Sequence, residues 1–303
     1  MSLDRTLEVP RLQRGHIHRA RHADIRGGGK GVNVARALRC VGVDAPVIGF
    51  SAGHTGHAVL GLLADEGIDV FSVRSGGETR SCLTVLSSGD VTVFNESGSP
   101  IDAESWGALE AEVAARLRPE TVFVCSGSFP PGAPSDGAAR LVTVARGLVA
   151  TTICDTSSEQ LRAALGAAPD LVAPNLAEAE TVLGGGEEEP VDAGEVALDR
   201  AAGAASALAA RGAAAVLVTA GAAGAVLVSG RDPPVALPAH EVEVVNPVGA
   251  GDCLVAGIAL GVAAGRDLVA SARRGMAMAA AGCESFAAGM LDPGRVDELL
   301  RQG

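Results

Sequence analysis

Short apolar runs alternate with amphipathic stretches along most of the chain. The apolar runs lie between turn residues and are too short for buried helices, so they predict strands. These are Ala45–Phe50, Asp69–Val73, Thr121–Cys125, Ala150–Asp155, Leu171–Ala173 and Ala214–Thr219. The stretches between them repeat apolar residues every three or four positions, which predicts helices at Val32–Val41, Gly56–Glu66, Ala103–Leu117, Ser135–Leu148, Ser158–Leu165, Leu176–Leu183 and Glu195–Ala210. The alternation is typical of βαβ units, and it indicates an α/β fold with a mostly parallel central sheet.

Two segments interrupt this alternation with partly polar, extended sequence. Thr79–Leu86 and Val91–Asn95 predict a hairpin around Ser88-Gly89-Asp90, and Leu7–Ile25 is also extended in character. Polar strands outside a main sheet indicate a small β-lid, with lid segments at about 7–25 and 76–98 of a single domain spanning 1–303. The acidic segment Gly184–Gly194 predicts a surface loop.

Composition narrows the classes of partner. The net charge of −12 and the aromatic content of 2% argue against binding to nucleic acid or to an anionic membrane. Residues 1–50 carry nine Lys/Arg against four Asp/Glu, so this segment favours an anionic ligand. The six cysteines show no disulfide or metal-ligand spacing. No apolar run approaches the ~20 residues of a membrane helix and no leader-like segment opens the chain, so we expect a cytoplasmic protein.

The clearest chemical signal is a glycine turn, Asn246-Pro247-Val248-Gly249-Ala250-Gly251-Asp252, between the β-rich segment Glu241–Val245 and an apolar helix. Backbone N–H groups at a helix start lack partners and favour an anion, together with the helix dipole. Asp252 would repel a phosphate that was merely held there. It fits a turn in which the acid takes a hydroxyl proton while the amides stabilise a phosphoryl group in transfer. Ordinary turn chemistry is the alternative in a chain with 40 glycines.

A second glycine cluster, Gly27-Gly28-Gly29-Lys30-Gly31, precedes the predicted helix at Val32–Val41. It is not a Walker A loop, because Gly31 stands where that loop has a Ser or Thr for magnesium. Lys30 is the only lysine among 24 Lys/Arg, which favours a need for a compact, flexible point charge there. We expect Lys30 and Asn33 in the first helical turn, close to a ligand.

These clusters occur with three others in an order that resembles the ribokinase-like (PfkB) carbohydrate kinases. The five motifs are Gly28–Ala35, Thr79-Arg80, Gly127-Ser128-Phe129-Pro130-Pro131-Gly132, Asn175-Leu176-Ala177-Glu178 and Asn246–Asp252. Thr79-Arg80, Asn95 with Gly98, and the Ser128 turn are similar to the sugar-phosphate branch of 1-phosphofructokinases and tagatose-6-phosphate kinases. The resemblance implies a three-layer sandwich with a small β-lid, and ATP and Mg²⁺ as cofactors.

The resemblance also implies residue roles. Asp252 would be the catalytic base, and the amides of Gly249, Ala250 and Gly251 would hold the developing charge. Residues implied to bind the sugar phosphate are Asp4, Gly29, Lys30, Asn33, Arg80 and Ser128, with the guanidinium of Arg80 on the phosphate. Residues implied to contact the nucleotide are Thr219, Gly221, Gly224, Ala279 and Cys283. Residues implied to place Mg²⁺ are Asn175 and Glu178.

Some of these residues have a structural alternative. Arg80 could be a solvated hairpin charge, and Asn175 with Glu178 could simply cap a helix. The sequence also departs from the family at three positions, where Pro247 replaces a usual Thr, Ala173 a usual Lys and Cys82 a frequent Asn.

The start of the chain is a further departure. Family members end a first strand with Asn-Pro-x-x-Asp, whereas only Met1-Ser2-Leu3 precedes Asp4 here. Either the natural sequence begins earlier, or the sheet lacks a strand and has an unpaired edge.

The expected function is that of an ATP- and Mg²⁺-dependent kinase for a hydroxyl of a ketohexose phosphate, with fructose 1-phosphate as first choice. The alternatives are a kinase for tagatose 6-phosphate or fructose 6-phosphate, a ribokinase or nucleoside kinase, and a sugar-phosphate-binding regulator with weakened catalysis. We expect no nucleic-acid or membrane partner. A lid of exposed strands favours a homodimer.

Overall fold

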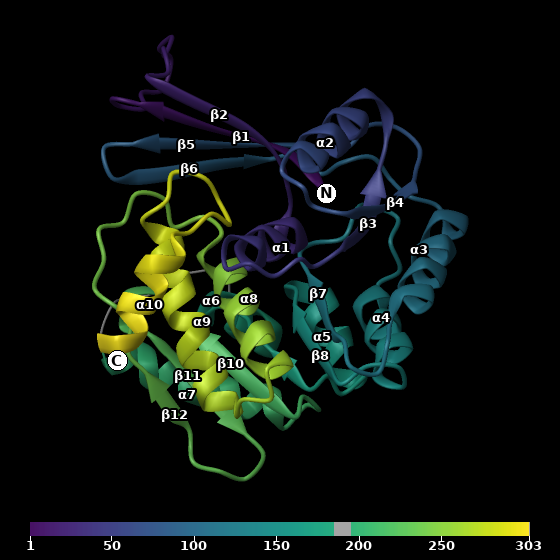
Figure 1. Ribbon diagram of the computed structural model, residues 1–303, viewed down its shortest axis with the longest axis vertical. Coiled ribbons are helices and arrows are strands. Elements are labelled where there is room, and N and C mark those ends of the chain that lie inside the picture. The colour runs from purple at the N-terminus through teal and green to yellow at the C-terminus, as the bar shows by residue number, and fades with distance from the viewer. Residues whose placement is uncertain (185–194, 303) are drawn as a thin grey trace.

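The computed structural model describes residues 1–184 and 195–302, and within them the strands form three separate sheets. The largest has six strands in the order β12-β11-β10-β9-β8-β7, a second has four in the order β2-β1-β5-β6, and β3 pairs with β4 alone. In Figure 1 the four-stranded sheet lies above the helices that surround the six-stranded sheet. The predicted loop Gly184–Gly194 lies, from residue 185 on, outside the described residues.

The six-stranded sheet is the centre of a three-layer sandwich. Its parallel strands are β7 (Val122–Ser126), β8 (Thr151–Asp155), β9 (Leu171–Val172) and β10 (Ala215–Thr219), followed by the antiparallel β11 (Ala225–Ser229) and β12 (Val235–Leu237). Alternate side chains of β10 enter different cores: Val216 and Val218 lie in one, and Leu217 in the other. The strands are therefore apolar on both faces, as a covered parallel sheet requires.

Two groups of helices cover these faces. The Leu217 side packs against α1 (Lys30–Cys40), α8 (Ala250–Ala263), α9 (Leu268–Cys283) and α10 (Pro293–Gln302). The Val216 side packs against α3 (Ala103–Arg116), α4 (Gly137–Arg146), α5 (Ser158–Gly166), α6 (Leu176–Leu183) and α7 (Glu195–Ala209). The predicted three-layer α/β architecture is confirmed. None of the helices in the described residues combines the length and hydropathy needed to cross a bilayer.

The four-stranded sheet contains the predicted hairpin. Strands β5 (Ser81–Ser87) and β6 (Asp90–Asn95) pair antiparallel around Ser88 and Gly89, which both have positive φ, as a two-residue hairpin turn needs. Strands β1 (Ser2–Val9) and β2 (His22–Gly28) complete the sheet. The extended segment expected at Leu7–Ile25 is wrong in its middle, because residues 10–21 form a loop between two strands.

The third sheet consists of β3 (Val47–Ser51) and β4 (Val70–Arg74), joined by α2 (Gly53–Asp65). Both strands were predicted, but they do not join the six-stranded sheet. Within the described residues β7 pairs only with β8, so the edges of β7 and β3 carry no further strand. The strand expected at Glu241–Val245 is also absent from the described structure. That segment is a coil, held where the amides of Val245 and Asn246 donate to the carbonyl of Cys283, at 2.8 and 3.0 Å.

Candidate active site

Residues from three distant parts of the sequence meet where β8 ends and where α1 and α8 begin. Lys30 is the first residue of α1, and its Nζ lies 2.9 Å from Oδ1 of Asp155 at the end of β8. Asn33, one turn along α1, donates from Nδ2 to Oδ2 of Asp252 at 2.8 Å, in the first turn of α8. The structure therefore brings the two predicted glycine clusters together around one carboxyl group.

Asp252 is 3% exposed, and its environment favours the neutral acid more than water does. Burial is the main cause that raises the pKa of its carboxyl to about 7. The cation of Lys30 opposes this rise, the carboxylate of Asp155 adds to it, the Asn33 hydrogen bond lowers it and Asp4 raises it. A carboxyl with a pKa near neutrality suits a general base, because it is available as carboxylate yet accepts a proton readily.

Lys30 remains a cation in this setting. Burial alone would lower the pKa of Lys30, but the carboxylates of Asp155, Asp252 and Glu178 together raise it above its ordinary value. Asp155, which also accepts from Ser126 Oγ at 2.9 Å, was missed at the sequence level. A signal was present: Asp155 directly follows a buried apolar run, and sites in parallel sheets collect at the carboxyl ends of strands.

The turn before α8 presents backbone donors beside Asp252. Gly249 has φ +88°, and a Cβ there would lie 2.9 Å from the amide nitrogen of Gly289. Asn246 helps to fix this turn, because its Oδ1 accepts from the backbone amide of Val248 at 3.0 Å. Within the described chain the amides of Gly249 and Gly251 donate to no acceptor, whereas that of Ala250 donates to Pro247 O at 3.2 Å. Two of the three amides expected at the anion site are thus available.

The predicted sugar-contacting residues lie at the start of α1. Asp4 on β1 is held by Ser2 Oγ at 2.6 Å, and its carboxylate lies over Gly28, where any Cβ would overlap it. Gly29 caps α1 with φ +108°, a conformation that favours glycine. Asn33 follows four residues later, and its backbone N–H donates to the carbonyl of Gly29 at 3.0 Å.

Arg80 and Ser128 form a polar contact outside the cluster around Asp252. The NH1 of Arg80 donates to Ser128 Oγ at 3.2 Å, and the two residues line one pocket together with Thr79, Gly98 and Pro130. The main chain of Arg80 is attached to β1, since its carbonyl accepts from the Leu3 amide at 2.9 Å. The half-buried Arg80 is therefore attached to β1 through its main chain and to Ser128 through its side chain.

The predicted nucleotide and metal residues lie at the ends of β9 and β10. Asn175 and Glu178 form a capping box: Oδ1 of Asn175 accepts from the Glu178 amide at 2.8 Å, and Oε2 of Glu178 accepts from the Asn175 amide at 2.9 Å. Asn175 also forms a β-bridge with Thr219, the last residue of β10. Gly221 begins the 3₁₀ turn η1 (Gly221–Ala223) and Gly224 directly follows it, and both glycines have positive φ.

Of the two predicted adenine-side residues, Cys283 ends α9 and Ala279 lies one turn before it. The carbonyl of Cys283 holds the segment that enters the Gly249 turn. The predicted nucleotide residues thus lie in two places, at and after the end of β10 and on the last turn of α9, whose Cys283 holds the segment before the Gly249 turn.

The sequence matches the description "pfkB family carbohydrate kinase" over residues 1–293. The chain belongs to this family. It is accordingly a phosphotransferase whose acceptor is a sugar hydroxyl, as the motifs predicted, and ATP is the donor that family membership implies.

Relatives support a similarity to the sugar-phosphate branch. The 1-phosphofructokinase of Escherichia coli (strain K12) is 31% identical over 254 residues, which cover 84% of this chain and 78% of the relative. The tagatose-6-phosphate kinase of Staphylococcus epidermidis is 26% identical over 268 residues, covering 86% and 82%. The crystal structure of Escherichia coli phosphofructokinase-2 in complex with fructose-6-phosphate has a TM-score of 0.85, with 27% identity, 99% coverage of this chain and 95% of that one. The expected resemblance is confirmed.

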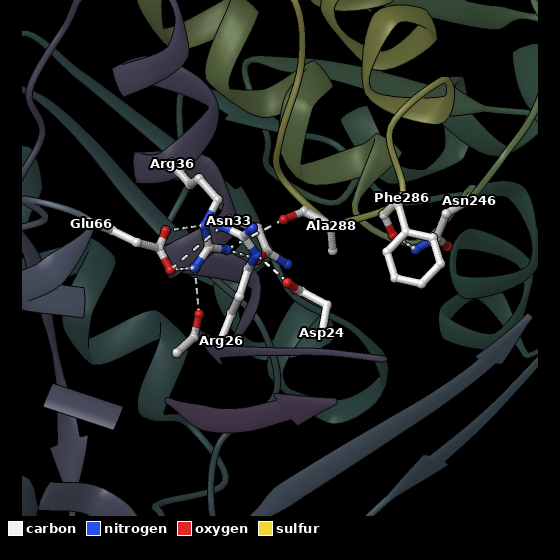
Figure 2. Close-up of polar contacts among 9 residues, drawn as sticks. Asp24, Arg26, Asn33, Arg36, Glu66, Asn246, Phe286 and Ala288 are labelled. Carbon is white, nitrogen blue, oxygen red and sulfur yellow. Dashed lines mark hydrogen bonds and ion pairs between the residues drawn. The ribbon is translucent and has the colours of Figure 1, made fainter. Parts of the chain in front are cut away.

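One further residue of this kinase's site was not predicted. Arg36 on α1 is 3% exposed and donates to Asn33 (Figure 2). Asn33 in turn donates to Asp252. Sequence reasoning assigns an arginine in an amphipathic helix to the solvent face, so no signal in the pattern singled it out.

Proposed function

We propose that this carbohydrate kinase uses ATP and Mg²⁺ to phosphorylate a ketohexose phosphate, with fructose 1-phosphate as its preferred acceptor. The contact between Arg80 and Ser128 carries the proposal. A guanidinium seated in a pocket beside a hydroxyl-bearing turn suits a phosphate that is already on the sugar, because its planar fork binds phosphate oxygens in pairs. A kinase for a free sugar has no need for such a group.

In the proposed reaction Asp252 accepts the proton of the C6 hydroxyl of fructose 1-phosphate. The oxygen bonds to the γ-phosphorus of ATP while the bond from that phosphorus to the β-phosphate oxygen breaks, giving ADP and fructose 1,6-bisphosphate. The amides of Gly249 and Gly251 donate to the oxygens of the moving phosphoryl group. Lys30 stabilises the carboxylate of Asp252 before the transfer and supplies positive charge close to the phosphoryl group during it.

The donor set near α6 fits a hydrated Mg²⁺. This ion keeps several waters and binds through one or two carboxylates plus substrate phosphates. The carboxylates of Glu178 and Asp155 both act on the charge of Lys30, and they would be the ones that hold the ion. When bound, the ion would neutralise charge on the ATP phosphates. Asn175 orients Glu178 through the capping box and is the partner of Thr219 at the proposed nucleotide site.

A kinase for tagatose 6-phosphate or fructose 6-phosphate is the second candidate. The relative from Staphylococcus epidermidis, named a tagatose-6-phosphate kinase, and the phosphofructokinase-2 structure with fructose-6-phosphate favour it. These sugars carry the resident phosphate at the opposite end, so they would have to be turned round for their C1 hydroxyl to reach Asp252.

The test is coupled ATP turnover against a panel of fructose 1-phosphate, fructose 6-phosphate, tagatose 6-phosphate, free fructose and ribose. We expect kcat/KM for fructose 1-phosphate to exceed each other value by at least about tenfold, because a lost charged hydrogen bond costs that much or more. A preference for either 6-phosphate would select the second candidate. Turnover of ribose alone, or of nothing, would reject both.

A further inference from the structure

Arg36 is the centre of a hydrogen-bond network shown in Figure 2, and Asn33 links this network to Asp252. Its Nε and NH2 donate to the two carboxylate oxygens of Glu66, the residue directly after α2, at 2.6 and 3.1 Å. NH2 also donates to the carbonyl of Gly27 at the end of β2, and NH1 to the carbonyl of Ala288 at 3.3 Å. The remaining contact of NH1 is Oδ1 of Asn33 at 2.8 Å. One guanidinium thus joins four segments that surround the glycine turns.

The contact with Asn33 determines which way its amide faces. Oδ1 accepts from Arg36 and Nδ2 donates to Asp252 Oδ2. If the amide were turned over, two donors would meet at Arg36 and an oxygen would face the carboxylate, so both hydrogen bonds would be lost. Because a guanidinium donates only, it excludes the turned amide, whereas a hydroxyl or an amide at position 36 would tolerate both orientations.

We propose that Arg36 is a positioning residue, which acts through Asn33 to hold Asp252 in the orientation and the ionised form that the proposed transfer requires. The inference rests on the proposed role of Asp252 as base. Asn33 donates to Oδ2 of Asp252, and this hydrogen bond holds the carboxyl group in one orientation. Oδ1 of Asp252 is then the oxygen that accepts from the sugar hydroxyl. Glu66, Gly27 and Ala288 hold the guanidinium in place, so Arg36 itself is pre-organised.

Lysine cannot replace arginine here. A single ammonium has no planar fork, so it cannot serve Asn33, the Gly27 carbonyl and both oxygens of Glu66 at once. Glu66 also lies 3.9 Å from Arg26, which pairs with Asp24 at 2.7 Å, so its carboxylate keeps a cation when position 36 is neutral (Figure 2). The variants Arg36→Met and Arg36→Lys therefore separate loss of charge from loss of geometry.

The experiment measures the ionisation of Asp252 directly, by ¹³C NMR of labelled aspartate in the absence of substrate, together with the pH profile of kcat. Charged groups facing Asp252 are Lys30 from α1, Asp155 from β8 and Asp4 from β1, and all three remain in the variants. In both Arg36 variants the Asn33 hydrogen bond weakens, so the pKa of Asp252 and the acid limb of kcat should move up by about one pH unit. We expect kcat at pH 7 to fall about tenfold, with a smaller change in KM.

Arg140→Met is the matched control. Arg140 makes a similar two-pronged contact with Glu110 between α4 and α3, without touching the site, so its loss should leave the Asp252 titration unchanged. A double variant keeps the test decisive if Arg36→Met folds poorly. When Asn33→Ala has already removed the connection between position 36 and Asp252, adding Arg36→Lys should no longer shift the Asp252 titration.

Two outcomes overturn the inference. In the first, both Arg36 variants leave the pKa of Asp252 unchanged; in the second, Arg36→Lys shifts that pKa equally in the wild-type and Asn33→Ala backgrounds. Neither depends on turnover. A wild-type protein inactive on every sugar phosphate would instead reject the proposed function, while the NMR shifts would still decide whether Arg36 positions Asp252.

Discussion

At the scale of single residues, the pairing of Lys30 with Asp155 determines how the charge of Lys30 acts on Asp252. Lys30 makes its direct ion pair with Asp155, at 2.9 Å, and acts on Asp252 only through the field of its charge. Asp252 thus has a cation close enough to oppose the cost of its burial but not paired with it. A direct ion pair would lower the pKa of the base and make its carboxylate a poorer proton acceptor.

Replacing Asp252 by Asn should therefore remove catalysis and stabilise the fold. We expect kcat to fall about a thousandfold or more, because no other group takes the proton. The folded state raises the pKa of this carboxyl from an ordinary value near 4 to about 7, so wild-type stability falls as pH rises between these values. The advantage of Asp252→Asn in unfolding free energy should widen by about 2.6 kcal/mol from pH 5 to pH 8. Urea unfolding at both pH values measures it; an equal difference at both would show that Asp252 does not titrate in this range.

Arg80→Ala tests recognition of the resident phosphate. Loss of the guanidinium should raise KM for fructose 1-phosphate about tenfold or more, while KM for ATP stays near the wild-type value. Arg74→Ala, at the exposed end of β4, is the control for removing a nearby surface charge. Steady-state kinetics with both substrates decides the matter. Equal losses for free fructose and fructose 1-phosphate would mean that Arg80 does not read the phosphate.

At the scale of elements, helix starts supply most of the proposed chemistry. The first turns of α1, α6 and α8 carry Lys30, Glu178 and Asp252, and each follows a strand or a glycine turn that the apolar pattern or the glycine run made visible. The sequence predicted these elements well because they depend on local rules. It missed Asp155 and Arg36, because their roles arise from contacts with residues distant in the chain.

The errors at element scale have the same origin. Glu241–Val245 has strand-forming composition, but Val245 finds its hydrogen-bond partner at the end of α9 and not on a neighbouring strand. Likewise, β3 and β4 were predicted as strands, yet no local pattern reveals whether a strand will pair with the six-stranded sheet. Strand existence is local information, whereas strand partnership is not.

The α6 capping box offers a way to separate structure from metal binding. Glu178→Gln keeps an oxygen that can accept from the Asn175 amide, so stability should change by less than about 0.5 kcal/mol, while the Mg²⁺ concentration for half-maximal activity should rise about tenfold. Asn175→Ala removes the cap and should cost about 1 kcal/mol. Thermal unfolding and Mg²⁺ titrations of activity measure both. An unchanged Mg²⁺ requirement in Glu178→Gln would leave the pair with a capping role only.

At the scale of the whole molecule, the four-stranded sheet has one face toward the site and another that is partly uncovered. Asp4 and Cys82 are register neighbours on the first face. Ile25, Arg5, Leu83 and Phe94 are register neighbours across all four strands on the second. Ile25 is 45% exposed and Phe94 55%. Three of these four residues are apolar, with Arg5 as the one charge among them, and exposed apolar side chains on a sheet are typical of an interface. We therefore propose that a second copy of the chain covers this face.

Phe94→Asp should therefore turn a homodimer into a monomer. An isologous contact places both copies of Phe94 in the interface, so each dimer gains two buried charges, and we expect its dissociation constant to rise by at least about a hundredfold. Light scattering across a concentration series measures the mass of wild type and variant. Leu148→Asp is the control, because Leu148 is a similarly exposed apolar residue at the end of α4 and lies outside the sheet. A wild type that stays monomeric at every concentration, or a Phe94→Asp variant that dimerises as the control does, would exclude this face. Since Asp4 and Phe94 belong to the same sheet, loss of the dimer should also raise KM for the sugar phosphate if pairing holds the sheet over the site.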